Sequence, residues 1–280
     1  MLCDRIPGRV LPVLLLLLGA AGHAASDEPD GYPAGPLPPE TTRRLVDPLT
    51  IPKDLSFAAG ERLQFRLGWS LFTVARAEMT VAPDTHEGRA ALRITLTTRT
   101  NRFADAFYKV RNTTTSWVAA DLSRSFEYSA VQREGSRRRD SVCRFDPETL
   151  TAHRLNRLTG EQEEPAKIVP GTFDPLGIVF FVRSIEFTLG DELLIPTSNG
   201  RELFYTLVRV VDKVERDFLS GRREAWVLEP DIKDVGGVFS RSENASLRFY
   251  ISADAARLPL RMESEVSVGS FWAELVDAES

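Results

Sequence analysis

Apolar and polar residues alternate along most of the chain after residue 55. Leu63, Phe65 and Leu67 alternate with Gln64 and Arg66 near the start of this region. A period of two places successive side chains on opposite faces, which is typical of strands with one face in water. The same alternation predicts strands at residues 63–71, 75–81, 92–96, 109–118, 124–133, 139–146, 150–157, 201–211, 223–229, 246–252, 258–267 and 270–277.

Turn-forming residues separate these runs. Asn199 and Gly200 suit a tight hairpin, because both tolerate a positive φ. Weaker turn signals lie at Gly88, Gly135 and Gly221. Many strands at short spacing predict a mainly β fold, a large antiparallel β domain that is either barrel-like or made of two sheets.

One segment, about residues 174–188, predicts a buried helix instead. Asp174 can accept hydrogen bonds from the first turn, Pro175 suits the first helical position, and Gly190 suits a stop after the helix. The residues between are apolar nearly all round, so the helix should be buried against the sheet. The pattern leaves two roles open, a lid over a ligand cavity or a plug in the core.

The first 24 residues have the pattern of a secretory signal peptide. Arg5 and Arg9 precede an apolar run at 10–18, and small residues follow up to Ala24. The run is shorter than the roughly 20 apolar residues that span a bilayer, so we expect cleavage near Ala24 rather than a membrane anchor. Cys3 precedes the run, which argues against lipid anchoring. We expect a periplasmic or secreted protein that is soluble, without a transmembrane span, after cleavage.

Residues 25–54 are rich in proline. Proline cannot donate a hydrogen bond to a β ladder, so this segment predicts a flexible leader. The expected organisation is therefore a signal peptide at 1–24, a Pro-rich flexible leader at 25–54 and a single antiparallel β domain at 55–278.

The composition excludes several kinds of partner and catalytic site. The net charge of −5 argues against a nucleic-acid partner. Signal cleavage would leave Cys143 as the one thiol, so no internal disulfide can form, and we expect this thiol to be buried. His86 and His153 accompany neither a serine nucleophile motif nor clustered metal ligands. We therefore expect no catalytic residue, metal or cofactor.

Two sets of residues are candidates for binding. Aromatic side chains of the predicted strands and helix could line a ligand cavity or its lid, or simply fill the core: Trp69, Tyr108, Trp117, Phe180 and Trp226. Arginines beside the turn at Gly135 could contact anionic groups of a lipid or glycan, since guanidinium forks match phosphate and carboxylate: Arg137, Arg138 and Arg139.

Several stretches stand out by their order and spacing. They are GERLQFRLGW at 60–69, FYKVR at 107–111, DPL at 174–176, SAD at 252–254, RLPLRME at 257–263 and GSFWAEL at 269–275. Together they resemble the domain of unknown function (DUF) 3108 family of exported bacterial proteins, over roughly residues 57–277. The resemblance implies a largely antiparallel β protein and supplies no activity or catalytic residues. The acidic pair usual before RLP is interrupted, because Ala255 and Ala256 follow Asp254.

These observations predict a non-enzymatic binding or envelope-maintenance module for a lipid or another apolar ligand. The alternative is a structural or interaction module that binds an envelope protein through a sheet edge or the leader. A third reading is a glycan-active enzyme that uses two carboxylates, such as Glu263 and Glu265 on one strand face. The expected partners are a lipid, an envelope glycan or an envelope protein, and no nucleic acid.

Overall fold

A computed structural model describes residues 43–55, 57, 59–231, 246–266 and 269–279. The predicted signal peptide at 1–24 and the first part of the predicted leader, at 25–42, lie outside the described residues.

The described residues form one curled sheet of 15 strands, in the order β1-β10-β11-β12-β13-β14-β15-β2-β3-β4-β5-β6-β7-β8-β9. The predicted mainly β class is confirmed, and a single sheet forms rather than two. The strands are β1 (Arg43–Leu45), β2 (Arg62–Trp69), β3 (Phe72–His86), β4 (Arg89–Thr100), β5 (Val110–Ala119), β6 (Ser125–Glu134), β7 (Arg137–Asp146), β8 (Thr151–Asn156), β9 (Ala166–Lys167), β10 (Glu192–Ser198), β11 (Leu203–Phe218), β12 (Gly221–Pro230), β13 (Ser246–Ser252), β14 (Pro259–Val266) and β15 (Gly269–Glu279).

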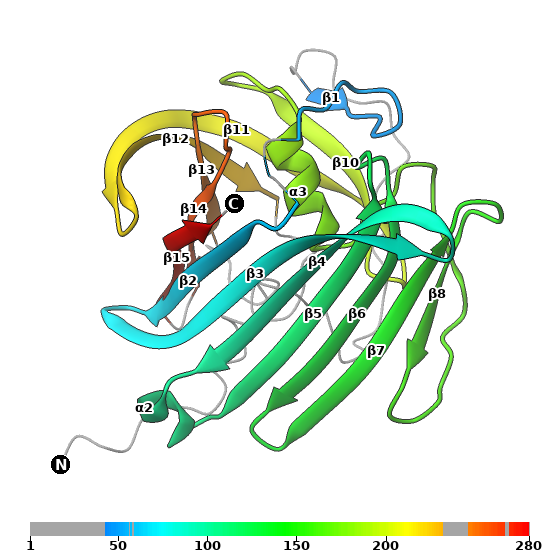
Figure 1. Cartoon of the computed structure of the whole chain (residues 1–280), viewed down its shortest axis with the longest axis horizontal. Helices are drawn as coiled ribbons and strands as arrows, with labels where there is room; N and C mark the ends of the chain where they lie inside the picture. The colour runs from blue at the N-terminus through cyan, green and yellow to red at the C-terminus, as the bar shows by residue number, and fades with distance from the viewer. Residues whose placement is uncertain (1–42, 56, 58, 232–245, 267–268, 280) are drawn as a thin grey trace.

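Neighbouring strands are antiparallel throughout this sheet, except that β1 pairs with β10 in parallel. The turn at Asn199 and Gly200 joins β10 to β11, as predicted. The last strand, β15, pairs with β2 and so lies beside the first strand of the predicted domain. Figure 1 shows the sheet curling around one helix, while the long β11–β12 hairpin arches over β13 to β15.

Three strands differ from the expectation, among them the two-residue β9 (Ala166–Lys167), for which no strand was predicted. The alternation did not indicate β10, because Leu193, Leu194 and Ile195 are consecutive apolar residues and Pro196 follows them. Strand β1 lies within the predicted leader, and Val46 next to it is buried. The last part of the leader, residues 43–54, therefore contributes an edge strand to the sheet.

The predicted helix is present as α3 (Gly177–Ser184) and is shorter than expected. Asp174 accepts hydrogen bonds from the backbone of Leu176 at 2.8 Å and of Gly177 at 2.9 Å, so its predicted capping role is observed. The helix ends before Ile185, which is extended and buried, and Gly190 lies beyond this end. Core packing of the extended segment, rather than a glycine stop, terminates the helix.

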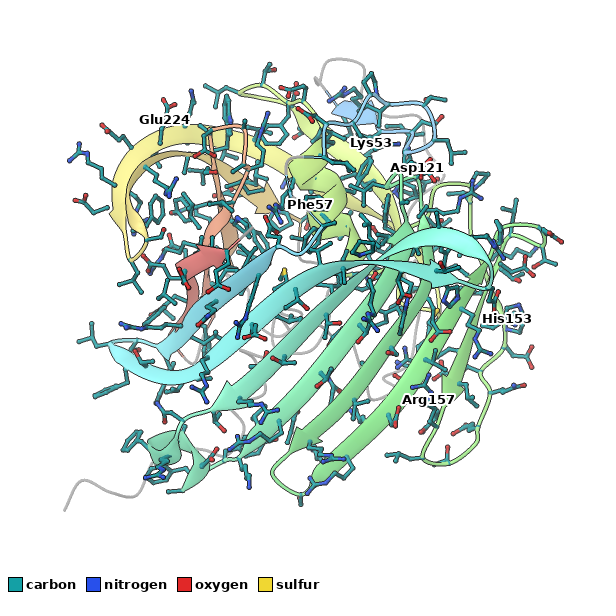
Figure 2. All side chains as sticks on the ribbon, viewed as in Figure 1. Lys53, Phe57, Asp121, His153, Arg157 and Glu224 are labelled. Carbon is teal, nitrogen blue, oxygen red and sulfur yellow. The ribbon has the colours of Figure 1, made fainter. Side chains whose placement is uncertain are left out.

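Helix α3 packs as part of the hydrophobic core. Phe180 and Phe181 are fully buried, Phe57 meets the edge of the Phe180 ring at 5.0 Å, and Phe173 stacks on Phe181 at 4.8 Å. Figure 2 shows Phe57 beside the helix. A second, four-residue helix, α2 (Arg102–Asp105), follows β4 and was not expected. The contacts of Phe180 and Phe181 in the core favour a plug over a lid as the role of α3.

Candidate functional site: an arginine row on the outer face

The five candidate aromatic residues lie in different surroundings. Phe180 belongs to the core, and Trp69 and Trp226 are half-buried at its border. Trp226 meets the Phe187 ring at 5.7 Å. Trp117 packs in a separate small cluster and donates a hydrogen bond to Asp84 at 3.1 Å.

Tyr108, the fifth of these residues, lies in the segment between α2 and β5. A side-chain carbon added at Gly135 would come within 2.9 Å of its ring, so Tyr108 covers the β6–β7 turn. The structure thus disperses the candidate aromatic set instead of lining one cavity with it.

The three candidate anion-contact arginines lie together on the β6–β7 hairpin. Arg137, Arg138 and Arg139 are all exposed at the start of β7. Arg138 donates to the backbone carbonyl of Gly135 at 2.8 Å, which holds its guanidinium close to the turn.

The strand register extends this arginine cluster across six strands. Arginines occupy directly opposed positions on β2, β3, β4, β5, β6 and β7. Directly opposed residues of antiparallel strands share one face of the sheet. The six side chains therefore form one line, about 24 Å long at the usual strand spacing of about 4.8 Å. We call this line the arginine row: Arg66, Arg76, Arg99, Arg111, Arg133 and Arg138.

The row lies on the outer face of the sheet. Leu67, Ala75 and Ala77, which precede or follow row residues on β2 and β3, point to the opposite face and are buried in the core. Five row arginines are exposed, and Arg111 is half-buried. The full length of the row is therefore open to a partner.

Few carboxylates balance these charges. Arg111 pairs with Asp105 of α2, with 2.5 Å between Nη2 and Oδ2. Among the residues that the structure describes, the other members of the row form no ion pair: Arg66, Arg76, Arg99, Arg133 and Arg138. Like charges in directly opposed positions destabilise a sheet. Folding therefore leaves a concentrated positive charge on this face.

The row ends at Glu274 of β15, which is opposite Arg66. Both oxygens of the buried Glu274 carboxylate are occupied by other partners. Oε1 accepts from the backbone of Leu219 at 2.8 Å, and Oε2 pairs with Arg261. This carboxylate thus lies at the end of the row but does not neutralise the charge of Arg66.

A second polar cluster continues from Glu274 beneath the β11–β12 arch. Tyr250 donates to Glu263 at 2.5 Å, and Arg261 donates to the same carboxylate at 2.8 Å. Surface pockets of about 540 and 460 Å³ border this cluster; the first is lined by Tyr250 and the second by Glu263.

Glu263, one of the two candidate carboxylates, does not have the pKa of a glycosidase general acid, and the side chain of Glu265, the other, lies outside the described residues. Burial by itself would raise the pKa of Glu263, but the hydrogen bonds from Tyr250 and Arg261 outweigh it and hold that pKa below its ordinary value. A glycosidase general acid needs a raised pKa so that it carries a proton at neutral pH. Glu263 is held as a structural anion instead.

The two histidines and the Cys143 thiol make packing contacts or local hydrogen bonds. His86 stacks on Phe126 with 6.0 Å between ring centroids. His153 is exposed on β8, where its Nε2 lies 2.8 Å from Thr151 Oγ1. Cys143 is buried against Gly200.

Sequence reasoning found only one end of the arginine row. Members of the row on β2 to β5 are scattered along the chain and lie in ordinary alternating runs. Their polar positions indicated an outer face, but the pairing register alone places them opposite one another. The signal available in the sequence was arginine recurring at solvent-facing positions close to strand ends.

Comparison with known proteins shows to which family the chain is related. The family model "Protein of unknown function (DUF3108)" matches residues 64–276, which confirms the resemblance seen in the sequence. No curated protein matches the chain. Neither α2 nor α3, the two described helices, is long and apolar enough to cross a membrane.

Three solved structures are similar at low sequence identity. The first is a β-barrel-like protein of DUF1849 from Brucella abortus, with 11% identity and a TM-score of 0.46, covering 79% of this chain and 97% of that one. The second is a candidate exported protein with a YmcC-like fold from Bacteroides fragilis, with 8% identity and a TM-score of 0.28, covering 82% and 98%. The third is a candidate lipoprotein from Parabacteroides distasonis, with 7% identity and a TM-score of 0.28, covering 82% and 97%.

A family model that spans most of the β sheet, from β2 to β15, settles the relationship: the chain belongs to the DUF3108 family of proteins of unknown function.

Proposed function

We propose that this protein is a non-enzymatic module of the bacterial envelope that binds phosphate-bearing anionic groups through its arginine row. The observation that carries the proposal is the run of directly opposed arginines, of which Arg111 alone pairs with a carboxylate among the residues that the structure describes. Guanidinium groups bind phosphate through paired N–H donors. Opposed like charges are unfavourable for folding alone, so a bound polyanion would relieve the repulsion.

The packing of α3 supports this location. A ligand held inside the sheet is the expectation from sequence, but α3 occupies part of that interior with phenylalanine side chains and an ion pair. The binding hypothesis therefore moves from the inner face to the outer face. Export by the predicted signal peptide would bring that face to envelope phosphates.

One of the three arginines predicted from sequence joins the row at its β7 end. Arg138 is a member of the row, whereas Arg137 and Arg139 precede and follow it on the strand and lie on the other face, opposite Glu134 and Gln132. We propose that Arg138 contacts the anionic partner together with the rest of the row.

Binding to inorganic polyphosphate tests the proposal, because this probe presents phosphate without lipid or protein. Each basic residue near an anionic surface contributes about 1 kcal/mol. The double variant Arg99→Glu with Arg133→Glu should therefore weaken binding at least ~30-fold, measured by calorimetry at low salt. Raising the salt should weaken wild-type binding, because mobile ions screen exposed charges.

A matched double variant separates local from net charge. Arg222→Glu with Arg223→Glu changes the net charge equally on the β12 strand, outside the row. It should leave polyphosphate binding within about twofold. Equal loss in both double variants, or no polyphosphate binding by the wild type, would refute the proposal.

A further inference from the structure

Four large apolar side chains stand exposed close to the arginine row. Leu71 is 94% exposed, Phe72 is 63%, and Phe103 and Phe107 are each 61% exposed. We call these residues the apolar tip. Leu71 lies in the turn between β2 and β3, Phe72 is the first residue of β3, and Phe103 and Phe107 belong to α2 and the segment after it.

The β2–β3 turn is held in place by the neighbouring strand. The backbone of Ser70 donates to the carbonyl of Ser270 at 2.8 Å, and Trp272 donates through Nε1 to the Ser70 carbonyl at 2.9 Å. The Trp272 ring lies directly on Gly68, where an added side-chain carbon would be 2.1 Å from it. The exposed Leu71 and Phe72 therefore project from a fixed turn.

Helix α2 is fastened to the same turn region. Asn101 donates through Nδ2 to the Thr73 carbonyl at 2.7 Å, and its backbone donates to the Val74 carbonyl at 2.9 Å. Its Oδ1 caps the helix by accepting from Ala104 at 2.9 Å. The Phe103 and Phe107 rings meet edge to face at 5.5 Å. Both parts of the apolar tip are thus built onto the start of β3.

The arginine row runs past both parts of the tip. Arg66 and Arg76 lie on the two strands that enter and leave the β2–β3 turn, while Arg99 and Arg111 flank α2 along the chain. Figure 1 shows the β2–β3 turn, α2 and the β6–β7 turn at the same end of the strands. Exposed apolar side chains and the positive charges of the row therefore lie near one another at one end of the sheet.

We infer that this end docks on an anionic lipid bilayer, an inference that rests on the proposed function and names its partner. Apolar side chains enter the boundary between headgroups and acyl chains, while basic residues hold anionic headgroups at the surface. A second copy of the chain is a poorer occupant, because a face-to-face dimer would bring two arginine rows together. A free polyanion would use the row and leave the apolar tip in water.

A fluorescent label reports whether the tip enters lipid. An environment-sensitive fluorophore is attached to Leu71→Cys, and separately to Leu189→Cys, which is 59% exposed beyond α3. The native Cys143 is buried and should not be labelled, and Cys3 belongs to the predicted signal peptide. On vesicles of phosphatidylglycerol and phosphatidylcholine, emission at position 71 should shift to the blue and be quenched by brominated lipids. Emission at position 189 should not change. An unchanged signal at position 71 on vesicles that bind the protein would overturn the inference.

A double substitution separates insertion from charge. Leu71→Ser with Phe72→Ser should lower vesicle affinity at least tenfold and leave polyphosphate binding unchanged. The control Leu158→Ser with Leu189→Ser removes two apolar side chains that are exposed elsewhere, by 56% and 59%, and should alter neither. Wild-type binding to polyphosphate without binding to vesicles would refute docking on lipid while the proposed function stands. Loss of both activities in Arg99→Glu with Arg133→Glu, but of vesicle binding only in the tip variant, would support both.

Discussion

Arg183 of α3 is a charged side chain completely removed from water. Its two terminal nitrogens each donate to Glu61 at 2.8 Å, and Nε donates to the Arg257 carbonyl at 2.9 Å. The guanidinium also lies 5.0 Å from the centres of the Phe57 and Phe180 rings. The pair joins the helix to the start of β2, two segments far apart along the chain.

Removing one member of this pair should be strongly destabilising. Glu61→Ala leaves the Arg183 charge buried without its counter-ion, and such a change costs about 3–5 kcal/mol. Urea unfolding followed by tryptophan fluorescence measures it. Arg62→Gln, which breaks an exposed pair with Glu78, is the control and should leave the unfolding midpoint nearly unchanged. Similar midpoints for both variants would contradict the role given to Glu61.

The buried thiol of Cys143 makes the free energy of unfolding depend on pH in the alkaline range. Burial raises the pKa of its thiol to about 12 from an ordinary value of 9.0, against a smaller lowering by Arg154. Below pH 9 the thiol is protonated in both states and has no effect. Above pH 9 the thiol ionises in the unfolded state but not in the folded state. This ionisation stabilises the unfolded state relative to the folded one.

The wild type should therefore lose about 1.4 kcal/mol per pH unit relative to Cys143→Ala as pH rises from 9 towards 12. Urea unfolding of both proteins across that range measures the difference, and other titrating groups cancel in the comparison. A constant difference would mean that the folded thiol ionises normally.

The pairing register of strands β2 to β7 creates the arginine row. A shift of one residue in any of the strands β2 to β7 would turn its arginine to the inner face. The buried residues that alternate with the arginines, such as Leu67 and Ala75, hold that register. The core thereby aligns the charges that oppose one another outside.

Reversing one central charge should improve stability while it impairs binding. Glutamate at position 99 would face Arg76 and Arg111 across the two adjacent strands. Opposed unlike charges contribute roughly 0.2–1 kcal/mol each, so Arg99→Glu should raise the free energy of unfolding at low salt, with a smaller gain at high salt.

Urea unfolding at two salt concentrations, beside polyphosphate binding, checks both parts of this expectation. Arg222→Glu, which instead loses its exposed pair with Glu215, should give no gain. A less stable Arg99→Glu protein would show that the row carries no repulsion.

The whole sheet closes along a seam between β7–β8 and the β10–β11 turn. Arg154 donates to the Asn199 carbonyl at 3.0 Å, and Arg201 forms a two-pronged pair with Glu163 at 2.7 and 2.8 Å. Gly200 has a φ of +86° and lies against Cys143, where an added side-chain carbon would be 2.6 Å from Sγ. Strands near the two ends of the strand order meet here through side chains and one close backbone approach.

Gly200→Ala should open this seam. The substitution combines an unfavourable positive φ with overpacking against Cys143, so it should lose about 1–3 kcal/mol more than Gly221→Ala. Gly221 is the matched control, because it also has a positive φ, of +108°, and has no atom within 4 Å of an added carbon. Urea unfolding and the rate of Cys143 modification by a thiol reagent measure the effect. Equal losses and an unreactive thiol in both variants would contradict the seam.

Local patterning was sufficient for most of the elements. Alternation located β2 to β8 and β11 to β15, and Asp174 marked the start of α3, because these signals depend on neighbours within a few residues. The end of α3 and strand β10 were missed, since long-range burial of Ile185 and Leu193 decided them. Of the predicted arginines at 137–139, Arg138 is one end of a longer feature.

By itself, the sequence determined the mainly β class, the buried helix and the family of this protein. The tertiary structure decided which strands pair and in which register, and so placed arginines from six strands in one line beside the apolar tip. It also placed the five candidate aromatic residues in different surroundings instead of one cavity. The physical reason is that alternation assigns each residue to a face, whereas position on that face depends on contacts between strands distant in the chain.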